Sequence, residues 1–176
     1  REVTPAGTTV VGLATVTTTG TTTSGFNADV DFSNFRNMEI SGFKWADLNN
    51  NRDWDEANSA VLGGWTIVLD RDNIVGNGNE ISTTVTAANG SYSFNIGAVT
   101  DGDGVLYVYE LQQSGFNQTF GNFSFNIQSG LVIRGDLGDA EQGNFGNHMM
   151  SGANRTPGFW QSTLGQSFYN GNPNDQ

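Results

Sequence analysis

Residues 81–96 decide the fold class, and they read Ile81-Ser82-Thr83-Thr84-Val85-Thr86-Ala87-Ala88-Asn89-Gly90-Ser91-Tyr92-Ser93-Phe94-Asn95-Ile96. Apolar or β-branched side chains alternate with polar ones on both sides of Asn89-Gly90, and this period of two is typical of half-buried strands. The Asn-Gly pair supplies the positive φ that a tight hairpin turn requires. The stretch therefore predicts a β-hairpin.

Further strands are predicted on both sides of this hairpin. They are short and separated by Gly, Asn and Asp, so that turn signals recur about every 8–12 residues, as in antiparallel sandwiches. With the hairpin, the sequence predicts an all-β fold, a seven-stranded antiparallel sandwich of the immunoglobulin type. The other predicted strands are residues 40–45, 64–70, 105–111, 121–127 and 131–134.

The composition agrees with an all-β chain and excludes several classes of function. Gly (24), Asn (21) and Thr (18) are abundant and are all poor helix formers. The formal net charge of −11 excludes binding to nucleic acid or anionic membranes through bulk charge. The absence of Cys excludes disulfides, thiolate metal sites and cysteine nucleophiles.

The composition also indicates where the protein works. No apolar run approaches the ~18 residues that would span a bilayer, so we expect no membrane insertion. The first residue is Arg1 instead of Met, and charged residues make up only 14% of the chain. We expect an upstream segment to have been removed and the protein to be secreted or displayed at a cell surface.

The regular pattern divides the chain into three parts. Residues 1–38 are rich in Thr and poor in large apolar groups, which predicts an extended β arm. Residues 39–139 carry the pattern of the sandwich domain. Residues 140–176 lose it, and we expect an irregular Gly/Asn-rich tail with aromatic anchors, Trp160 among them.

An acidic loop between two predicted strands, residues 47–58, is the strongest candidate for a site. Oxygen-bearing side chains recur at its first, third, fifth, seventh and ninth positions, and such spacing directs alternate side chains at one centre. Ca²⁺ binds six to eight oxygen ligands and accepts Asn amides and backbone carbonyls. The candidate ligands are Asp47, Asn49, Asn51, Asp53 through its carbonyl, Asp55 and Glu56.

The loop departs from the usual calcium pattern at two positions. Arg52 stands where such loops have the Gly that permits a sharp turn, and Asn58 stands where they have a bidentate Glu, a role that Glu56 is expected to fill. A solvated acidic turn without an ion is the alternative interpretation. Both remain open at the level of the sequence.

Four segments stand in a fixed order along the chain: residues 42–51, 63–70, 84–94, and 107–110 with 113–119. Together they resemble the calcium-binding B-type repeat domains of serine-aspartate-repeat surface adhesins. The resemblance covers about residues 39–139. It implies a prealbumin-like variant of the immunoglobulin sandwich, in which the acidic loop binds Ca²⁺ and stiffens a rod-like array.

A related family, the collagen-adhesin B-type domains, implies a second site. Its members form an intramolecular amide between a first-strand Lys and a last-strand Asn, assisted by an acid. Lys44 is the only lysine in the chain, Glu110 occupies the position of the acid, and Asn126 is assigned as the Asn. Burial would favour the neutral, nucleophilic amine that this reaction requires.

These observations predict a non-catalytic extracellular protein. The only histidine, His148, lies in the Gly/Asn-rich tail with no Ser-Asp pattern near it, so we expect no enzyme. We expect a calcium-stiffened subunit of a filament or matrix, pairing with its own copies by strand addition or surface packing. The alternative is an adhesin or carbohydrate-binding module that stacks glycans on Trp54 or Trp160.

Overall fold

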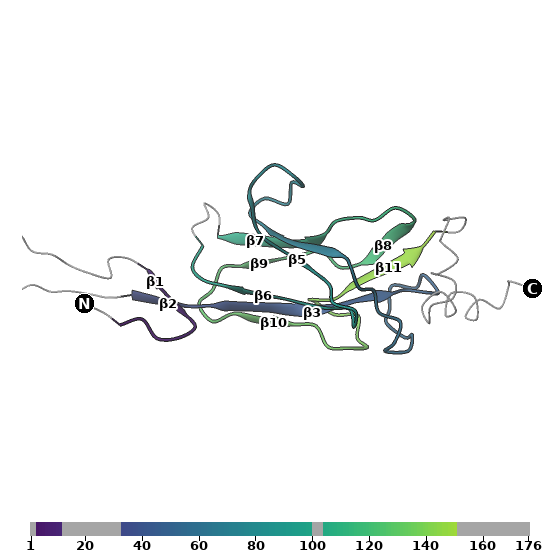
Figure 1. The fold of residues 1–176 in the computed structure, drawn as a ribbon, viewed down its shortest axis with the longest axis horizontal. Helices are drawn as coiled ribbons and strands as arrows, with labels where there is room; N and C mark the ends of the chain where they lie inside the picture. Colours follow the sequence, from purple (N-terminus) through teal and green to yellow (C-terminus); the bar gives the residue numbers. More distant parts are fainter. Residues whose placement is uncertain (1–2, 12–32, 100–103, 151–176) are drawn as a thin grey trace, which may run out of the picture.

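A computed structural model describes residues 3–11, 33–99 and 104–150 and confirms the all-β sandwich. Every regular element in this part of the chain is a strand, and the strands form two sheets that face each other, with a two-stranded ribbon beyond one end (Figure 1). No helix long and apolar enough to cross a membrane occurs among these residues.

The first sheet is built around the long strand β3 (Met38–Ala46). Strand β6 (Ser91–Ile96) pairs with it antiparallel along one side. On the other side β10 (Val132–Arg134) and then β11 (Phe145–Met149) pair with it in parallel. Strand β8 (Phe116–Phe120) continues this sheet, antiparallel to β11.

The second sheet is antiparallel throughout. Its order is β5 (Glu80–Val85), β4 (Thr66–Asp70), β7 (Val105–Glu110) and β9 (Phe123–Asn126). The turn predicted at Asn89-Gly90 forms, but the hairpin prediction is wrong, because β5 pairs with β4 and β6 pairs with β3. The turn therefore joins the second sheet to the first instead of joining two paired strands. Gly90 has φ 77°, as the turn requires.

The core lies between the two sheets and follows the alternation of the sequence. In β6, Tyr92, Phe94 and Ile96 are buried while Ser93 and Asn95 are exposed. Apolar side chains at alternate positions of the other strands meet them, and removing this surface from water is the main stabilising term. The central members include Ile40, Ile67, Leu69, Leu106, Val108 and Phe145.

The N-terminal arm forms its own ribbon in the part of it that is described. Strand β1 (Thr8–Val11) pairs antiparallel with β2 (Ser33–Arg36), which leads directly into β3. Side-chain hydrogen bonds fasten the ribbon to the sandwich, one of them from Asn37 Nδ2 to Asn95 Oδ1 at 2.7 Å.

The structure differs from the sequence expectation at β8 and β11. Neither strand was predicted, and the parallel pairing of β3 with β10 and β11 departs from a purely antiparallel sandwich. Strand β11 falls within the segment assigned to the irregular tail, so the sandwich extends past residue 139. Gly146 explains the weak pattern, because a Cβ there would lie 2.5 Å from the Trp45 ring.

Candidate functional site

Three strands bring Lys44, Glu110 and Asn147 together inside the sandwich. Lys44 lies on β3, Glu110 ends β7 in the opposite sheet, and Asn147 lies on β11. Their exposed fractions are 0%, 6% and 0%. Three polar side chains without access to water must satisfy one another, because an unpaired buried charge is strongly unfavourable.

The three side chains form a closed triangle of contacts. Lys44 Nζ lies 2.5 Å from Glu110 Oε2 and also contacts Asn147 Oδ1. Asn147 Nδ2 donates a hydrogen bond to Glu110 Oε1 at 2.7 Å. The amine is therefore held next to the carboxamide, and the carboxyl group touches both.

Aromatic and apolar side chains enclose this triangle. The Trp65 ring lies 4.6 Å from Lys44 Nζ, and Trp65 in turn packs edge-on against Phe116. Phe145 faces Lys44 across the β3–β11 pair and is fully buried. This surrounding excludes water and lowers the local dielectric constant.

The enclosure shifts the pKa values of both ionisable groups. Burial lowers the pKa of Lys44 to about 8, although the nearby Glu110 carboxylate acts in the opposite direction. Burial raises the pKa of Glu110 above its ordinary value, and Lys44 and Asn147 oppose that shift. Both shifts favour the uncharged amine and the uncharged carboxyl group.

These groups are the components that intramolecular amide formation needs. A neutral amine is a nucleophile, the Asn147 carboxamide carbon is an electrophile, and a protonated Glu110 can carry protons between them. The alternative is that Lys44 and Glu110 remain an unreacted ion pair. Such a pair would keep two charges buried inside the sandwich, at a large cost in desolvation free energy.

The sequence prediction placed Lys44 and Glu110 here but chose a different asparagine. Asn126 is exposed at the end of β9, where it pairs with Val105 of β7, so it does not reach Lys44. Asn147 stands in its place. Asn147 was missed because β11 lacks an alternating pattern. The one signal in the sequence was the similarity of residues 144–147 to residues 34–37, and both of these segments lie at strands.

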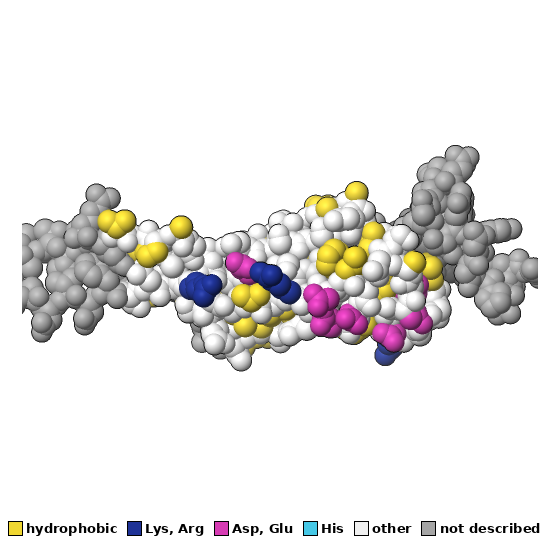
Figure 2. All heavy atoms as spheres, turned by 90° about the horizontal axis from the view of Figure 1, so that it is seen from below, with side chains coloured by type: hydrophobic (Ala, Val, Ile, Leu, Met, Phe, Trp, Pro, Cys, Tyr) yellow, Lys and Arg dark blue, Asp and Glu magenta, His cyan; other side chains and the backbone are white. Residues whose placement is uncertain are grey.

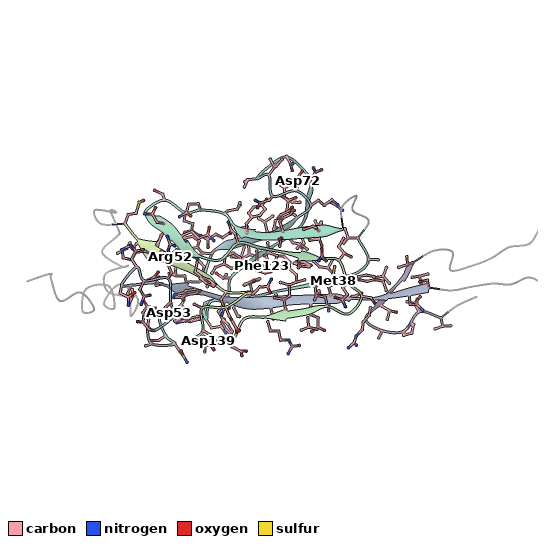
Figure 3. The ribbon with its side chains drawn as sticks, turned by 180° about the vertical axis from the view of Figure 1, so that it is seen from behind. Met38, Arg52, Asp53, Asp72, Phe123 and Asp139 are labelled. Atoms are coloured by element: carbon pink, nitrogen blue, oxygen red, sulfur yellow. The ribbon has the colours of Figure 1, made fainter. Side chains whose placement is uncertain are left out.

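The acidic loop leaves the C-terminal end of β3, next to the triangle. Asp47 is fully buried, and its two carboxylate oxygens accept the backbone N–H groups of Asn51 and Arg52 at 3.1 and 3.0 Å. Figure 3 shows Arg52 and Asp53 at the end of the sandwich opposite the β1–β2 ribbon. On the face in Figure 2, acidic side chains gather toward that same end.

Four of the predicted ligands lie in one hydrogen-bonded cluster. Asn49 Nδ2 and Asn51 Nδ2 donate to the Asp55 carboxylate at 3.1 and 3.0 Å. The side-chain oxygens of Asn49 and Asn51 each accept the backbone N–H two residues further on. The sixth position, Arg52, takes the left-handed backbone conformation, with φ 68°, that Gly provides in calcium loops.

The donor set of this loop fits a hard cation. Its oxygens come from carboxylates and amides, which Ca²⁺ accepts. No group of three His, Cys, Asp or Glu side chains suited to a metal occurs among the described residues, so the Asn amides would be needed as ligands. Of the remaining candidates, Asp53 accepts the Trp54 N–H, and Glu56 accepts the Leu48 N–H at 2.6 Å.

The loop and the triangle share the strand β11. The Asp47 N–H donates to the carbonyl of Asn147 at 2.9 Å, and His148 Nδ1 lies 2.8 Å from the Asp47 carbonyl. Burial raises the pKa of Glu56, whose carboxylate lies at the base of this loop. The two candidate sites are therefore neighbours in space, joined through the backbone that carries Asn147.

Trp54 does not have the exposure that a glycan platform requires. It is 4% exposed and stacks on Trp45 with ring centroids 5.0 Å apart and planes at 6°. The prediction that Trp54 stacks glycans is therefore wrong, since Trp45 covers one face of its ring and almost none of the side chain is exposed. Trp160 lies outside the described residues.

Comparisons with solved structures find similar folds. The shaft pilin SpaA from Lactobacillus rhamnosus GG is 13% identical, with TM-score 0.41, over 65% of this chain and 50% of that chain. The full-length major pilin SpaD from Corynebacterium diphtheriae is 16% identical, with TM-score 0.39, over 70% and 32%. The chain is distantly similar in structure to bacterial pilins.

The same comparison finds BcpA, the major pilin subunit of Bacillus cereus, at 15% identity and TM-score 0.39, over 64% of this chain and 29% of that chain. The chain thus spans about half the length of SpaA and less of the other two. No protein-family model and no curated protein matches the sequence. Function must therefore be inferred from the residues of this chain.

Proposed function

We propose that the protein is a non-catalytic structural β-sandwich of an extracellular or cell-surface assembly, closed internally by an amide bond between Lys44 and Asn147. The observation that carries this proposal is the buried triangle of Lys44, Glu110 and Asn147. A triangle of this kind costs desolvation free energy as long as it stays unreacted. Conversion of its amine and carboxamide into one neutral amide removes that cost.

The reaction follows from the contacts. Neutral Lys44 Nζ attacks Cγ of Asn147, and a new C–N bond forms while the carbonyl oxygen gains negative charge. Glu110 starts protonated and touches both reacting side chains, so it gives its proton to Nδ2 of Asn147 and takes one from the attacking nitrogen, and ends protonated again. Ammonia leaves as the old C–N bond breaks, and no oxidant or cofactor is consumed.

The position of the amide suits a structural role. Lys44 lies on the first strand of the sandwich and Asn147 on the last, and these two strands pair in parallel. A covalent bond between them encloses the sequence from Lys44 to Asn147, a separation of 103 residues. Such a bond restricts the unfolded chain in the way that a disulfide does, in a sequence that contains no Cys.

Calcium binding at loop 47–58 belongs to the same proposal. The cluster of Asp47, Asn49, Asn51 and Asp55 and the left-handed Arg52 support it. A bound Ca²⁺ would relieve the repulsion among the loop carboxylates and would hold the end of β3 rigid. The resemblance to B-type repeat domains, which implied this ion, and the acidic composition point the same way.

Mass spectrometry of the purified, unfolded protein tests the amide directly. We expect the intact mass to be about 17 Da below the value calculated from the sequence, because one ammonia is lost. Proteolysis should yield one branched peptide pair that joins the segments containing Lys44 and Asn147. A full calculated mass in freshly folded and in aged protein would refute the proposal.

Three variants separate the roles of the side chains. Asn147→Ala removes the electrophile and should restore the calculated mass of that variant. Glu110→Ala removes the proton carrier but keeps both reacting groups, and this variant should also show its full calculated mass. Asn126→Ala is the matched control, since Asn126 is exposed on β9 and should leave the loss of ammonia unchanged.

A further inference from the structure

The outer edge of β5 carries backbone groups that have no partner in the described part of the chain. Thr86, directly after β5, donates its N–H to the Trp65 carbonyl and accepts the Gly64 N–H, both at 2.8 Å, so its backbone faces the segment that leads into β4. Successive residues of a strand face opposite sides. The N–H and C=O groups of Thr83 and Val85 therefore face away from β4, and no described residue bonds to them there.

This edge lacks the usual protection against pairing. Natural edge strands carry Lys, Pro, a bulge or an inward charge that blocks a further strand. Between Ile81 and Thr86 the sequence has no charged residue and no Pro. The one irregularity, the register shift between Leu69 and Asp70, lies at the Glu80 end of the strand and leaves Thr83 and Val85 in regular pairing.

The side chains at these positions are also suited to a partner strand. Val85 is 59% exposed, and Thr83 is exposed next to it on the same face of the sheet. β-branched side chains on neighbouring strands stabilise a sheet by about 0.2–1 kcal/mol per cross-strand pair. An edge of this composition gains from a neighbour with the same residues.

We propose that β5 pairs antiparallel with β5 of a second copy of this chain. A twofold axis at Thr84 sets Thr83 opposite the partner's Val85, and the two reciprocal pairs each exchange both of their backbone hydrogen bonds. The second sheets of the two copies then join into one continuous sheet. This inference deepens the proposed structural role and rests on it, because it names the surface through which the subunit associates.

The single charged residue of β5 selects the direction of pairing. Glu80 is the one charged residue of β5. Parallel pairing would bring the two Glu80 carboxylates side by side, whereas antiparallel pairing places them at opposite ends of the paired strands. The net charge of −11 on each copy still opposes association at long range. We therefore expect the dimer to strengthen as salt screens that repulsion.

Replacement of Thr83 by proline tests the proposal on the full chain. The Thr83 N–H faces away from β4, so Thr83→Pro removes an outward donor without removing a hydrogen bond of the sheet, as edge strands tolerate. Thr83→Val is the matched control, because it keeps the donor and the β-branched shape. Sedimentation velocity from about 10 µM to 1 mM, at low and at physiological salt, measures the association.

The wild type and Thr83→Val should dimerise, and Thr83→Pro should raise the dissociation constant by at least about tenfold. Amide hydrogen exchange at Thr83 and Val85 should slow as the concentration of the wild type rises. A monomeric wild type over the whole range, or a Thr83→Pro protein that associates like the wild type, would overturn the inference. Should Thr83→Pro not fold, Thr83→Lys gives the same comparison.

The mass measurement on the same samples keeps the two proposals apart. A protein that loses ammonia but stays monomeric retains the internal amide and refutes only the β5 interface. A protein that dimerises through β5 without losing ammonia refutes the amide and leaves the interface.

Discussion

The buried triangle and the acidic loop adjoin each other, yet they are built in opposite ways. The triangle draws one residue from each of three strands, and its members are separated by up to 103 residues in sequence. The loop draws its candidate ligands from one run of consecutive residues, most of them exposed to solvent. The first depends on the whole fold, whereas the second depends on local backbone conformation.

This difference determines how each site should respond to change. Loss of a group in the triangle leaves buried polar atoms without partners or removes a bond that spans the domain, and both effects are large. Changes in the loop act on groups that water can solvate, so their effects should be smaller and should depend on the ion. The measured effects should therefore decrease from the triangle to the loop.

The largest effect is expected for Asn147→Ala. Without the amide, the unfolded chain regains the freedom of a loop of roughly 100 residues, which corresponds to about 4–5 kcal/mol on the scale used for cross-links. Urea unfolding of the wild type and the variant measures the difference in unfolding free energy. Asn126→Ala should stay within about 0.5 kcal/mol of the wild type. Equal midpoints for wild type and Asn147→Ala would contradict the cross-link.

A smaller effect is expected from pH in the Asn147→Ala protein, where Lys44 stays free. The pKa of Lys44 is about 8 in the folded state and 10.5 in the unfolded state. Between these values the unfolded state binds more protons, so the stability of this variant should rise with pH from 8 to 10.5. The gain is at most about 3.4 kcal/mol for a shift of this size.

The wild type provides the control for this pH dependence. Its Lys44 nitrogen is an amide in the proposed protein and does not titrate, so the rise between pH 8 and 10.5 should be absent. At acid pH, Glu110 contributes to the stability of the variant because its pKa is higher in the folded than in the unfolded state. This contribution is complete below the pKa of Glu110 in the unfolded state, and it is lost as the pH rises through the pKa in the folded state. Parallel stability curves for the two proteins above pH 8 would count against a free, buried Lys44 in the variant.

The contrast between the two sites also explains what the sequence could predict. Alternating side chains and the Asn89-Gly90 turn were enough for the two strands, the turn between them and the all-β class, because burial of one face imposes a period of two. They did not give the pairing of those strands, which belong to different sheets. The loop was recognisable for a similar reason, since its spacing is local. Asn147 was not recognisable from the sequence. The hydrogen-bond partners of its buried amide lie on β3 and β7, and only the folded chain brings these strands to it.

An intermediate effect is expected from Ca²⁺. Binding to the folded state alone raises the unfolding free energy by about 2.7 kcal/mol at a hundredfold excess over the dissociation constant. Scanning calorimetry with Ca²⁺ and with a chelator measures the shift for the wild type. Asp55→Asn should reduce it, because Asp55 supplies the carboxylate at the centre of the cluster.

Asp72→Asn is the matched control for this measurement. Asp72 is half-buried in the loop that projects between β4 and β5, and it accepts hydrogen bonds from Asn77 and Asn79 much as Asp55 does from its own neighbours. The calcium shift of Asp72→Asn should equal that of the wild type. Identical melting of the wild type in Ca²⁺ and in chelator would remove calcium from the proposal.

The smallest effect is expected at Arg52, where the loop backbone is left-handed. A non-glycine residue at φ 68° is disfavoured by about 1–2 kcal/mol, and Arg has no short side chain that could compensate locally. Arg52→Gly relieves this cost but makes the unfolded chain more flexible, which offsets about 0.4–1 kcal/mol. We therefore expect a net stabilisation between zero and about 1.6 kcal/mol, measured by urea unfolding in chelator.

Asn50 separates the backbone effect from the charge effect, because it is also left-handed, with φ 59°, and Asn tolerates that conformation well. Asn50→Gly should therefore leave stability unchanged or lower it slightly. In Ca²⁺, Arg52→Gly should bind the ion more tightly than the wild type, since it removes the one positive charge between Asp47 and Asn58. If Arg52→Gly instead loses stability in chelator, the ion-free protein does not adopt the left-handed turn that makes this loop similar to calcium loops.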